Sequence, residues 1–315
     1  MNLYPLKFEP LYKERIWGGR TLERVFNRRL PAGVKIGESW DLADLPNDKS
    51  VITNGDLAGR TLAAAIRSYP GEIVGDACIS GPFPLLIKLL DAQDVLSVQV
   101  HPDTATCRRT GRGEPKTECW YIISAEPGAF IYKGLKKGVT KDGFVEAVRR
   151  GTVADMLAKV PVEAGQCHFL PAGTPHSIGA GLLIAEIQTP SDTTYRVFDF
   201  DRVDNAGKPR QLHIDEAIES IRFDASAEEL TVTTVGRLAR CKFFTIDKGH
   251  QLENCEALLS PGKMKTLIFL SGCGNIERAD GHSVAFRAGE TLLVPAAYEG
   301  VVRFKGDTPY LIVTI

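Results

Sequence analysis

The sequence lacks the features of a secreted, membrane-spanning or nucleic-acid-binding protein. Its seven cysteines are odd in number and include no CxxC pair, which argues against a disulfide framework and against a thiolate metal site. The first residues, MNLYPLKFEP, lack the apolar core of a signal peptide, and no run approaches the roughly 20 apolar residues of a membrane span. The net charge is only −1, and no basic face stands out. We therefore expect a cytoplasmic globular protein whose partners include neither nucleic acid nor membrane.

Short apolar segments punctuated by Gly and Pro occupy most of the chain instead. The tripeptide EPG between two of these segments, 119–125 and 129–134, predicts a β-hairpin. Short strands with regular turn signals indicate a sandwich or jelly roll rather than βαβ units. We therefore predict a mainly β protein, with strands at 84–91, 95–100, 119–125, 129–134, 181–188 and 193–200.

An internal repeat gives the clearest signal of architecture. The stretches GQCHFLPAGTPHSI (165–178) and GETLLVPAAYEGVV (289–302) align without a gap, with a Gly and a Pro in common positions. His176 of the first copy corresponds to Gly300 of the second. This pattern predicts a duplicated β-barrel unit in which only the N-terminal copy kept a polar site.

The repeat also predicts how the chain is divided. We expect an N-terminal catalytic domain over residues 1–223, with helical insertions at about 56–75 and 139–159. An amphipathic helix at about 212–223 would join it to a C-terminal barrel over residues 224–315. The copy of the repeat in this second barrel lacks candidate metal ligands, so we interpret the barrel as a scaffold.

Polar residues alternate with valines in the stretch SVQVHPD. On a strand, Gln99 and His101 would point to the same side, because residues two apart share a face. Glu118 opens another strand, and His176 lies at a turn. Two imidazoles and one carboxylate suit Zn²⁺ in an open catalytic site, whereas the neutral amide of Gln99 is a weaker ligand. The structural alternatives are a capped strand end at His101, a Glu118–Lys116 surface pair and a plain turn at His176.

Three cations near these candidates suit a negatively charged ligand. Arg196 and Arg202 are six residues apart in TTYRVFDFDR, which would place both on one face of a strand if no bulge intervenes. Lys116, two residues before Glu118, should share the face of Glu118. A surface salt bridge is the alternative for either arginine.

Further candidates come from the neighbouring strands. Lys88 and Ser97 could line the same mouth, and Glu186 in LLIAEIQ would be half-buried, with a raised pKa that suits a general base or acid. Asp192 and Lys116 are alternative bases. His168 fits a strand in the core or at the surface, and nothing couples the remaining histidines, His213, His250 and His282, to the site.

Several motifs together resemble a known family. The spacing G-x5-P-x-G-x2-H that ends at His176 is similar to the second conserved motif of the cupin superfamily. The wider set resembles type I phosphomannose isomerase in its short bacterial form, from the N-terminus to about residue 223 and more weakly beyond. It comprises FEPLYKERIWGGRTL, GESWDLAD, LSVQVHPD, KTECWYI and PAGTPHSIGAGLLIAEIQTPSDTTYRVFDFDR.

The resemblance implies two cupin-like jelly-roll barrels and one Zn²⁺ per chain. The implied reaction interconverts mannose 6-phosphate and fructose 6-phosphate by proton transfer through a cis-enediol(ate). The implied metal ligands are Gln99, His101, Glu118 and His176. The resemblance places Arg196 in the active site, opposite the metal, and puts Arg202 at a substrate-facing position, but it settles no base. Our predicted catalytic set is Arg196, Glu186 and Lys116, and our predicted phosphate-binding set is Arg202, Lys88 and Ser97.

Two other functions remain open at this point. Two histidines and a carboxylate also describe the facial triad of non-haem Fe(II) oxygenases, and His101-Pro102-Asp103 supplies an HxD pair, although Pro102 would end the strand. A sugar-binding barrel that lost catalysis would keep the metal motif but would have no need of Arg196 and Glu186. The sequence leaves a monomer and a homodimer equally open.

Overall fold

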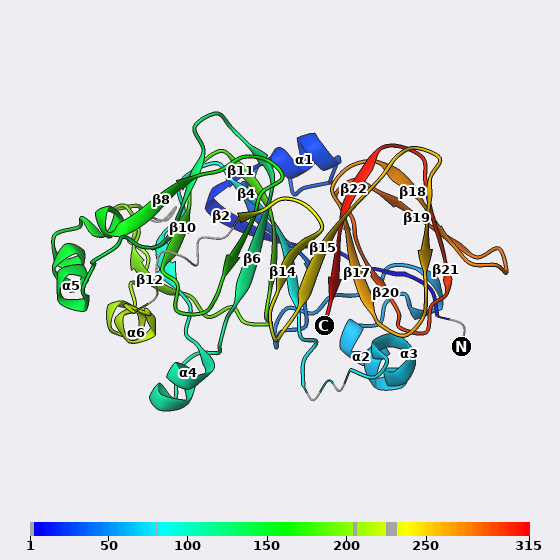
Figure 1. Cartoon of the computed structure of the whole chain (residues 1–315), viewed down its shortest axis with the longest axis horizontal. Helices are drawn as coiled ribbons and strands as arrows, with labels where there is room; N and C mark the ends of the chain where they lie inside the picture. The colour runs from blue at the N-terminus through cyan, green and yellow to red at the C-terminus, as the bar shows by residue number, and fades with distance from the viewer. Residues whose placement is uncertain (1–2, 78, 80, 204–206, 225–231) are drawn as a thin grey trace.

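The chain folds into two groups of antiparallel sheets that lie side by side along the long axis of the molecule (Figure 1). The computed structural model describes residues 3–77, 79, 81–203, 207–224 and 232–315. A seven-stranded and a five-stranded sheet form the first barrel, and a six-stranded and a four-stranded sheet form the second. The prediction of a mainly β, two-barrel fold is confirmed.

The strands of the first barrel include the segments in which the sequence analysis found the candidate polar residues. Its seven-stranded sheet has the order β13-β9-β6-β11-β4-β3-β2, and its five-stranded sheet has the order β12-β5-β10-β7-β8. The large sheet contains β2 (Leu11–Gly19), β3 (Ile36–Leu42), β4 (Leu86–Ala92), β6 (Glu118–Ala125), β9 (Cys167–Leu170), β11 (Leu182–Gln188) and β13 (Val232–Thr233). The small sheet contains β5 (Val98–Val100), β7 (Phe130–Leu135), β8 (Leu157–Pro161), β10 (His176–Ile178) and β12 (Tyr195–Phe198).

The predicted hairpin at 119–134 is wrong. β6 pairs with β9 and β11, whereas β7 pairs with β8 and β10 in the opposite sheet. The EPG turn therefore carries the chain around a corner of the jelly roll, with Gly128 at φ 81°. A tight turn fixes the reversal of the chain, but the choice of sheet depends on partners that arrive from elsewhere in the sequence.

The second barrel includes a strand from the beginning of the chain. β1 (Leu6–Lys7) pairs with β20 in a sheet of order β1-β20-β17-β22-β15-β14, and the smaller sheet has the order β16-β21-β18-β19. The other strands are β14 (Arg237–Arg240), β15 (Thr245–Gln251), β16 (Glu256–Leu259), β17 (Lys265–Phe269), β18 (Cys273–Glu277), β19 (Ser283–Arg287), β20 (Thr291–Val294), β21 (Gly300–Phe304) and β22 (Thr308–Thr314).

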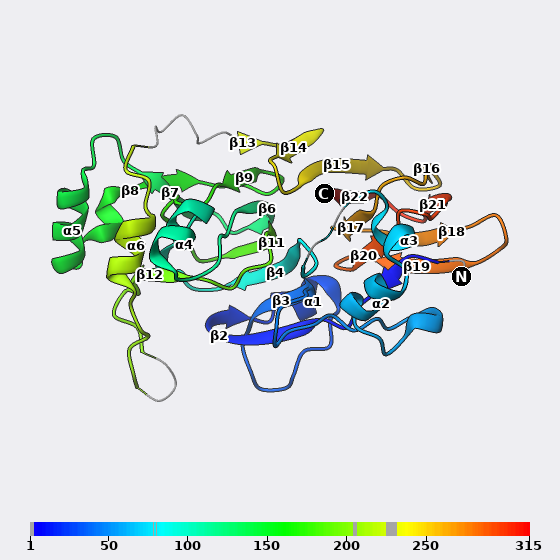
Figure 2. The same ribbon diagram turned by 90° about the horizontal axis from the view of Figure 1, so that it is seen from below.

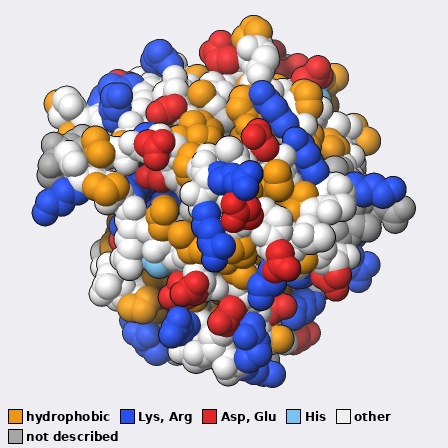
Figure 3. Space-filling model, turned by 90° about the vertical axis from the view of Figure 1, so that its left-hand side faces the viewer, with side chains coloured by type: hydrophobic (Ala, Val, Ile, Leu, Met, Phe, Trp, Pro, Cys, Tyr) orange, Lys and Arg blue, Asp and Glu red, His pale blue; other side chains and the backbone are white. Residues whose placement is uncertain are grey.

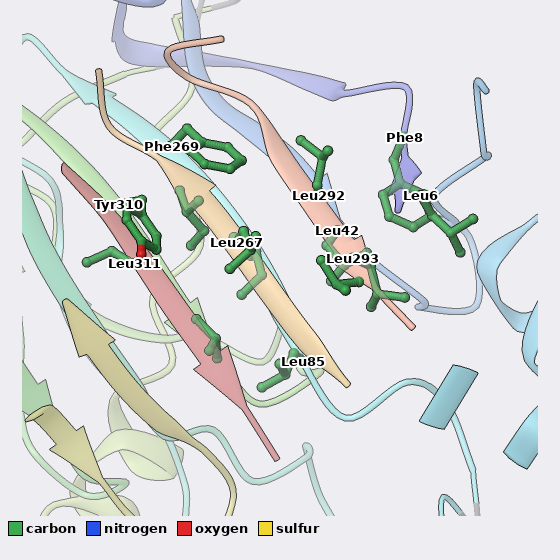
Figure 4. Packing of buried hydrophobic residues seen from close by; sticks show 14 of the residues in the cluster. Leu6, Phe8, Leu42, Leu85, Leu267, Phe269, Leu292, Leu293, Tyr310 and Leu311 are labelled. Carbon is green, nitrogen blue, oxygen red and sulfur yellow. The ribbon is translucent and has the colours of Figure 1, made fainter. Parts of the chain in front are cut away.

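One apolar cluster joins the two barrels. Leu6 and Leu42 from the N-terminal part pack with Leu267, Leu292 and Leu293 from the C-terminal part (Figure 4). β13, which follows the predicted boundary, likewise pairs with β9 of the first barrel. The predicted domain boundary at residue 223 stays a prediction. A strand from before this residue pairs within the second barrel and a strand from after it pairs within the first, and residues 225–231 lie outside the described residues.

Six α-helices lie around the sheets in the described part of the chain. They are α1 (Thr21–Phe26), α2 (Leu62–Ser68), α3 (Pro70–Val74), α4 (Thr104–Thr110), α5 (Lys141–Arg149) and α6 (Ile214–Ser220). α4, α5 and α6 gather at the outer end of the first barrel, and α2 and α3 lie beside the second (Figure 2). The predicted helix at 139–159 is too long, since residues 157–161 form β8. None of the helices in the described ranges is long and apolar enough to cross a membrane.

The internal repeat is confirmed by the positions of its strands. β9 and β10 occupy the first copy as β20 and the start of β21 occupy the second, and each copy crosses from one sheet of its barrel to the other. Gly165 and Gly289 both adopt positive φ, at 93° and 77°. A Cβ at Gly300 would lie 2.4 Å from the carbonyl oxygen of Glu277 and 2.7 Å from the ring of Tyr298. The second copy therefore has no room for a side chain where the first has its histidine.

A buried ion pair ties the barrels together. Arg28 donates to both carboxylate oxygens of Asp41, at 2.6 and 2.7 Å, and to the carbonyl oxygen of Gly289. Thr291 donates to the same carboxylate at 3.0 Å. Gly289 and Thr291 belong to the second barrel, so this one pair satisfies polar groups on both sides of the interface.

We expect Arg28→Ala to lower the free energy of unfolding by about 3–5 kcal/mol, because it leaves the Asp41 charge buried and unpaired. Urea unfolding followed by circular dichroism measures this. Arg150→Ala, which breaks the exposed Arg150–Glu146 pair, is the matched control and should cost about 1 kcal/mol or less. Equal losses in the two variants would show that the buried pair does not stabilise the interface.

Candidate metal centre and cavity

Three predicted ligands meet inside the first barrel. Glu118 opens β6 in the large sheet, His176 opens β10 in the small sheet, and His101 follows the end of β5. Their ligand atoms all lie within 4.8 Å of one another, and no side chain of the three is more than 2 % exposed. The Nε2 atoms of His101 and His176 are 3.3 and 3.2 Å from the two oxygens of Glu118.

Backbone carbonyls orient both imidazoles. Nδ1 of His101 lies 2.8 Å from the carbonyl oxygen of Thr193, and Nδ1 of His176 lies 2.8 Å from that of Thr174. A carbonyl oxygen can only accept, so Nδ1 carries the proton and Nε2 presents a lone pair toward Glu118. This carbonyl–histidine arrangement is typical of ligands whose other nitrogen binds a metal.

The charge states support the same conclusion. Burial lowers the pKa of His101 to about 3 and also lowers the pKa of His176, so both rings are neutral. Burial would raise the pKa of Glu118, but Lys116 and the two histidines hold it well below its usual range. Among the described residues, neither Nε2 nor either oxygen of Glu118 makes a well-formed hydrogen bond, although Lys116 Nζ forms an ion pair with one Glu118 oxygen at 3.0 Å. Three sets of lone pairs facing one another fit a divalent cation.

Gln99 lies next to this cluster, on the cavity side. It is paired in register with His176 on β10 and with Arg196 on β12, so the three residues form one row across the sheet. Asp103, in contrast, caps α4 by accepting a hydrogen bond of 2.7 Å from the backbone N–H of Thr106. The HxD pair expected of an oxygenase is therefore not formed by His101 and Asp103.

A cavity of about 480 Å³ opens beside the cluster, between the two sheets. Six of the predicted site residues line it: Lys88, Ser97, Gln99, Lys116, Glu186 and Arg196. Lys88 and Ser97 face the cavity from opposite sheets, since Lys88 lies on β4 and Ser97 precedes β5. The two residues line the same cavity, although they do not belong to adjacent strands.

Two buried lysines are paired with carboxylates along the cavity wall. Lys116 Nζ is 3.0 Å from Glu118, as expected for residues that share a face, and Lys88 Nζ is 3.3 Å from Glu186. Trp120 Nε1 donates to the other oxygen of Glu186 at 3.2 Å. Burial raises the pKa of Glu186, and the charge of Lys88 opposes that rise.

Among the residues that the structure describes, Arg196 forms no such ion pair with a carboxylate. Its Nε lies 3.3 Å from Ser97 Oγ, and its Nη1 donates to the carbonyl oxygen of Gln211 at 2.9 Å. Burial, followed by the nearby charge of Arg210, lowers the pKa of Arg196. Within the described residues its hydrogen bonds reach only neutral groups, so the guanidinium remains available to an anion.

The expectation that Arg202 shares a strand face with Arg196 is wrong. The register shifts between Arg196 and Phe198, β12 ends there, and Phe200 and Asp201 both turn at φ 54°. Arg202 does not line the cavity described above and instead pairs with Asp199 at 2.6 Å. Its binding of phosphate stays a prediction that depends on the resemblance.

Sequence reasoning also missed residues that line the cavity. His213, which we expected to be uncoupled from the site, accepts the backbone N–H of Arg196 at its Nδ1, at 3.4 Å, and lines the cavity. Arg210 lies there too, and so do Arg15 and Glu38, whose motifs ERIWGGR and GESWDLAD were the only available signal. His168, in contrast, is a fully buried residue of β9, which agrees with the expectation of a core strand and not with that of a surface strand.

The outer end of the first barrel carries interspersed acidic and basic side chains (Figure 3). Such a mixed surface produces little long-range field of one sign. Selection of a charged ligand therefore depends on the side chains inside the cavity.

Comparisons with known proteins agree on one family. A family model described as "Phosphomannose isomerase type I, catalytic domain" matches residues 5–118. The chain is 36% identical to mannose-6-phosphate isomerase of Streptococcus mutans over 311 residues, 96% of either chain, and 36% identical to mannose-6-phosphate isomerase ManA of Bacillus subtilis over 308 residues, 94% of either.

Solved structures show the same similarity. The crystal structure of mannose 6-phosphate isomerase from Bacillus subtilis superimposes with a TM-score of 0.89 at 27% identity, and covers 99% of this chain and 100% of that one. A variant of phosphomannose isomerase from Salmonella typhimurium gives a TM-score of 0.76 at 16% identity, with coverage of 99% and 100%, which shows the fold alone.

Glu38 should make stability depend on pH. Burial would raise its pKa, but Lys88 and Arg15, with Trp40 donating at 2.6 Å, lower it from 4.5 to about 2. A carboxyl whose pKa is lower in the folded than in the unfolded protein stabilises the fold at pH values above its unfolded-state pKa. This stabilisation is lost as the pH falls toward the folded-state pKa of about 2. We expect Glu38→Gln to unfold more easily than wild type by on the order of 3 kcal/mol at pH 7, with the difference shrinking between pH 5 and pH 2.

Urea unfolding at several pH values measures this difference. Glu253→Gln, at an exposed position of the second barrel, is the control and should follow the wild type at every pH. A Glu38→Gln deficit that is independent of pH would show that the Glu38 charge contributes nothing and that only its hydrogen bonds matter.

Proposed function

The chain belongs to the type I phosphomannose isomerases, and we propose that it interconverts mannose 6-phosphate and fructose 6-phosphate with one zinc ion per chain. The observation that carries the metal is the buried set of lone pairs on His101, Glu118 and His176. Two imidazoles and a carboxylate match the donor set of open zinc sites. Gln99 lies at the cavity edge of this set and is the proposed fourth ligand. We further propose a cytoplasmic location for the enzyme.

The metal would supply a single contribution to the chemistry. Zn²⁺ held by these residues would polarise the oxygens at C1 and C2 of the open-chain sugar and stabilise the negative charge that develops there. The rest of the reaction falls to side chains of the cavity.

The row of residues across the small sheet sets the direction of the substrate. His176, Gln99 and Arg196 lie on three neighbouring strands, so the outer two are about 10 Å apart at the usual strand spacing. A six-carbon sugar phosphate has its reacting carbons near one end and its phosphate at the other. We place C1 and C2 next to His176 and Gln99, with the guanidinium of Arg196 facing the substrate's negative charge from the other side.

Glu186 is the proposed base. The proton must move between C1 and C2 on one face of a cis-enediol(ate), which requires a single group within reach of both carbons. Glu186 is buried, lines the cavity, and is held by Trp120 and Lys88. Burial that raises its pKa brings the carboxylate closer to the basicity that proton transfer from carbon needs. Lys88 therefore acts on the charge of Glu186 more directly than on phosphate.

Lys116 and Ser97 complete the proposed machinery. Lys116 keeps Glu118 charged and aligned, while its ammonium also borders the cavity, where it can donate to a substrate oxygen. Ser97 supports the guanidinium of Arg196 and presents a hydroxyl to the same ligand.

Metal analysis and a coupled assay test the proposal. We expect about one zinc per chain, isomerisation of mannose 6-phosphate, loss of activity with a chelator, and recovery on adding Zn²⁺. His176→Ala should lose both the metal and the activity, while His250→Ala, at an exposed position, should keep both. Iron together with oxygen consumption would favour the oxygenase, and a metal-loaded protein without turnover would leave only the sugar-binding function.

Replacing the base should separate chemistry from metal binding. We expect Glu186→Gln to lower kcat by about 10²- to 10⁴-fold while the zinc content stays near that of the wild type. Asp192→Asn, at another acidic position that lines the cavity, is the matched comparison and should retain most of the activity. Near-normal turnover of Glu186→Gln, with a large loss in Asp192→Asn, would transfer the role of base to Asp192.

A further inference from the structure

We propose that Arg210, oriented by Asp199, is the residue through which the cavity recognises the phosphate of its sugar substrate. This inference rests on the function proposed above. It concerns a residue that neither the sequence motifs nor the resemblance indicated.

Asp199 binds two arginines, of which Arg210 lines the cavity and Arg202 does not. Arg210 donates to it side-on, with Nε 2.6 Å from Oδ2 and Nη2 in contact with Oδ1. Arg202 donates to Oδ1 through Nη2 at 2.6 Å. Asp199 itself is only 6 % exposed, so its carboxylate fixes both guanidiniums from the protein side.

The two arginines differ in what they leave available. Arg202 also donates to the carbonyl oxygens of Val95 and Asp199 and lies 3.7 Å from Asp94, so most of its donors face the protein. Arg210 lines the cavity, and within the described residues its hydrogen bonds use only Nε and Nη2. Its Nη1 edge is therefore the one that can meet a ligand.

The segment after Arg210 is tied to the strand that carries Arg196. Arg196 Nη1 donates to the carbonyl oxygen of Gln211 at 2.9 Å, and the backbone N–H of His213 donates to the carbonyl oxygen of Arg196 at 2.8 Å. These bonds hold Arg210 beside Arg196, at the end of the row that is remote from the metal cluster. A sugar with C1 and C2 at the metal end would bring its phosphate to this place.

The charge of the cluster suits a phosphate dianion. Within the described part of the chain, Asp199 and the exposed Asp94 offset the three guanidiniums of Arg196, Arg202 and Arg210, which leaves one positive charge in excess. Guanidinium N–H groups bind phosphate oxygens with charge-assisted hydrogen bonds, and an arginine already fixed by a carboxylate loses little entropy in doing so. An unphosphorylated sugar would leave this excess charge unpaired.

Steady-state kinetics of Arg210→Gln test the inference. We expect KM for mannose 6-phosphate and the inhibition constant of inorganic phosphate each to rise about 10- to 100-fold, with kcat changed less than about threefold. Arg202→Gln should raise KM less than Arg210→Gln does. Arg237→Gln, which breaks an exposed pair with Asp247 in the second barrel, is the control and should leave all three constants unchanged.

Asp199→Asn tests the positioning role. If Asp199 orients Arg210, the variant should also raise KM, although it adds positive charge to the cluster. A lower KM would show that Asp199 only neutralises the arginine, and that outcome would overturn the positioning part of the inference.

Other results would overturn the assignment of Arg210 itself. These are an unchanged KM in Arg210→Gln, a fall in kcat without a rise in KM, or a larger effect from Arg202→Gln. Binding of inorganic phosphate measured by calorimetry on the wild type and on Arg210→Gln separates this inference from the proposed function. A wild type that does not isomerise mannose 6-phosphate would refute the function, whereas equal phosphate binding by both proteins would refute the role of Arg210.

Discussion

Two imidazole lone pairs and a carboxylate face one another in the buried interior of the first barrel, and this arrangement fits a cation. The protons on Nδ1 of His101 and His176 are committed to backbone carbonyls, so neither ring can turn its lone pair away from Glu118 without breaking a buried hydrogen bond. Lys116 supplies part of the missing positive charge at 3.0 Å from Glu118. A divalent ion would satisfy all three ligands at once. The strands that deliver them therefore have to meet at one point, from both sheets of the barrel.

The same demand for compensation explains the charges along the cavity. Glu38 is paired with Arg15, Lys88 with Glu186, and Lys116 with Glu118, so that acidic and basic groups alternate along the wall. Buried charges are tolerated when partners and hydrogen bonds replace the lost water. Arg196 departs from this rule, because its guanidinium reaches only Ser97 and a carbonyl oxygen among the described residues. A site that leaves one cation unpaired is organised for an anionic ligand.

The sequence predicted those parts of the site whose positions depend on the residue pattern within one short segment. The alternation of Gln99 and His101, the position of Glu118 at a strand start and the turn before His176 are properties of short segments. Three of these residues, His101, Glu118 and His176, do come together in the structure. Arg202 and the 119–134 hairpin failed for a different reason. A register shift after Arg196 and a choice between two sheets are decided by partners distant in sequence. Arg210 went unnoticed, and His213 was expected to be uncoupled from the site, because no short motif signals a loop that folds back onto β12.

The two barrels differ at the position that His176 occupies in the first. Where the first copy of the repeat places His176, the second has Gly300 covered by the ring of Tyr298, and no ligand remains there. Apolar side chains of the second barrel continue into the cluster that holds Leu6 and Leu42. The first barrel replaces part of its own apolar interior by charged groups and a cavity of about 480 Å³. Burial of polar groups and open volume both reduce stability. The Arg28–Asp41 pair and the apolar cluster shared by the two barrels therefore stabilise a first barrel whose own interior contains charged groups.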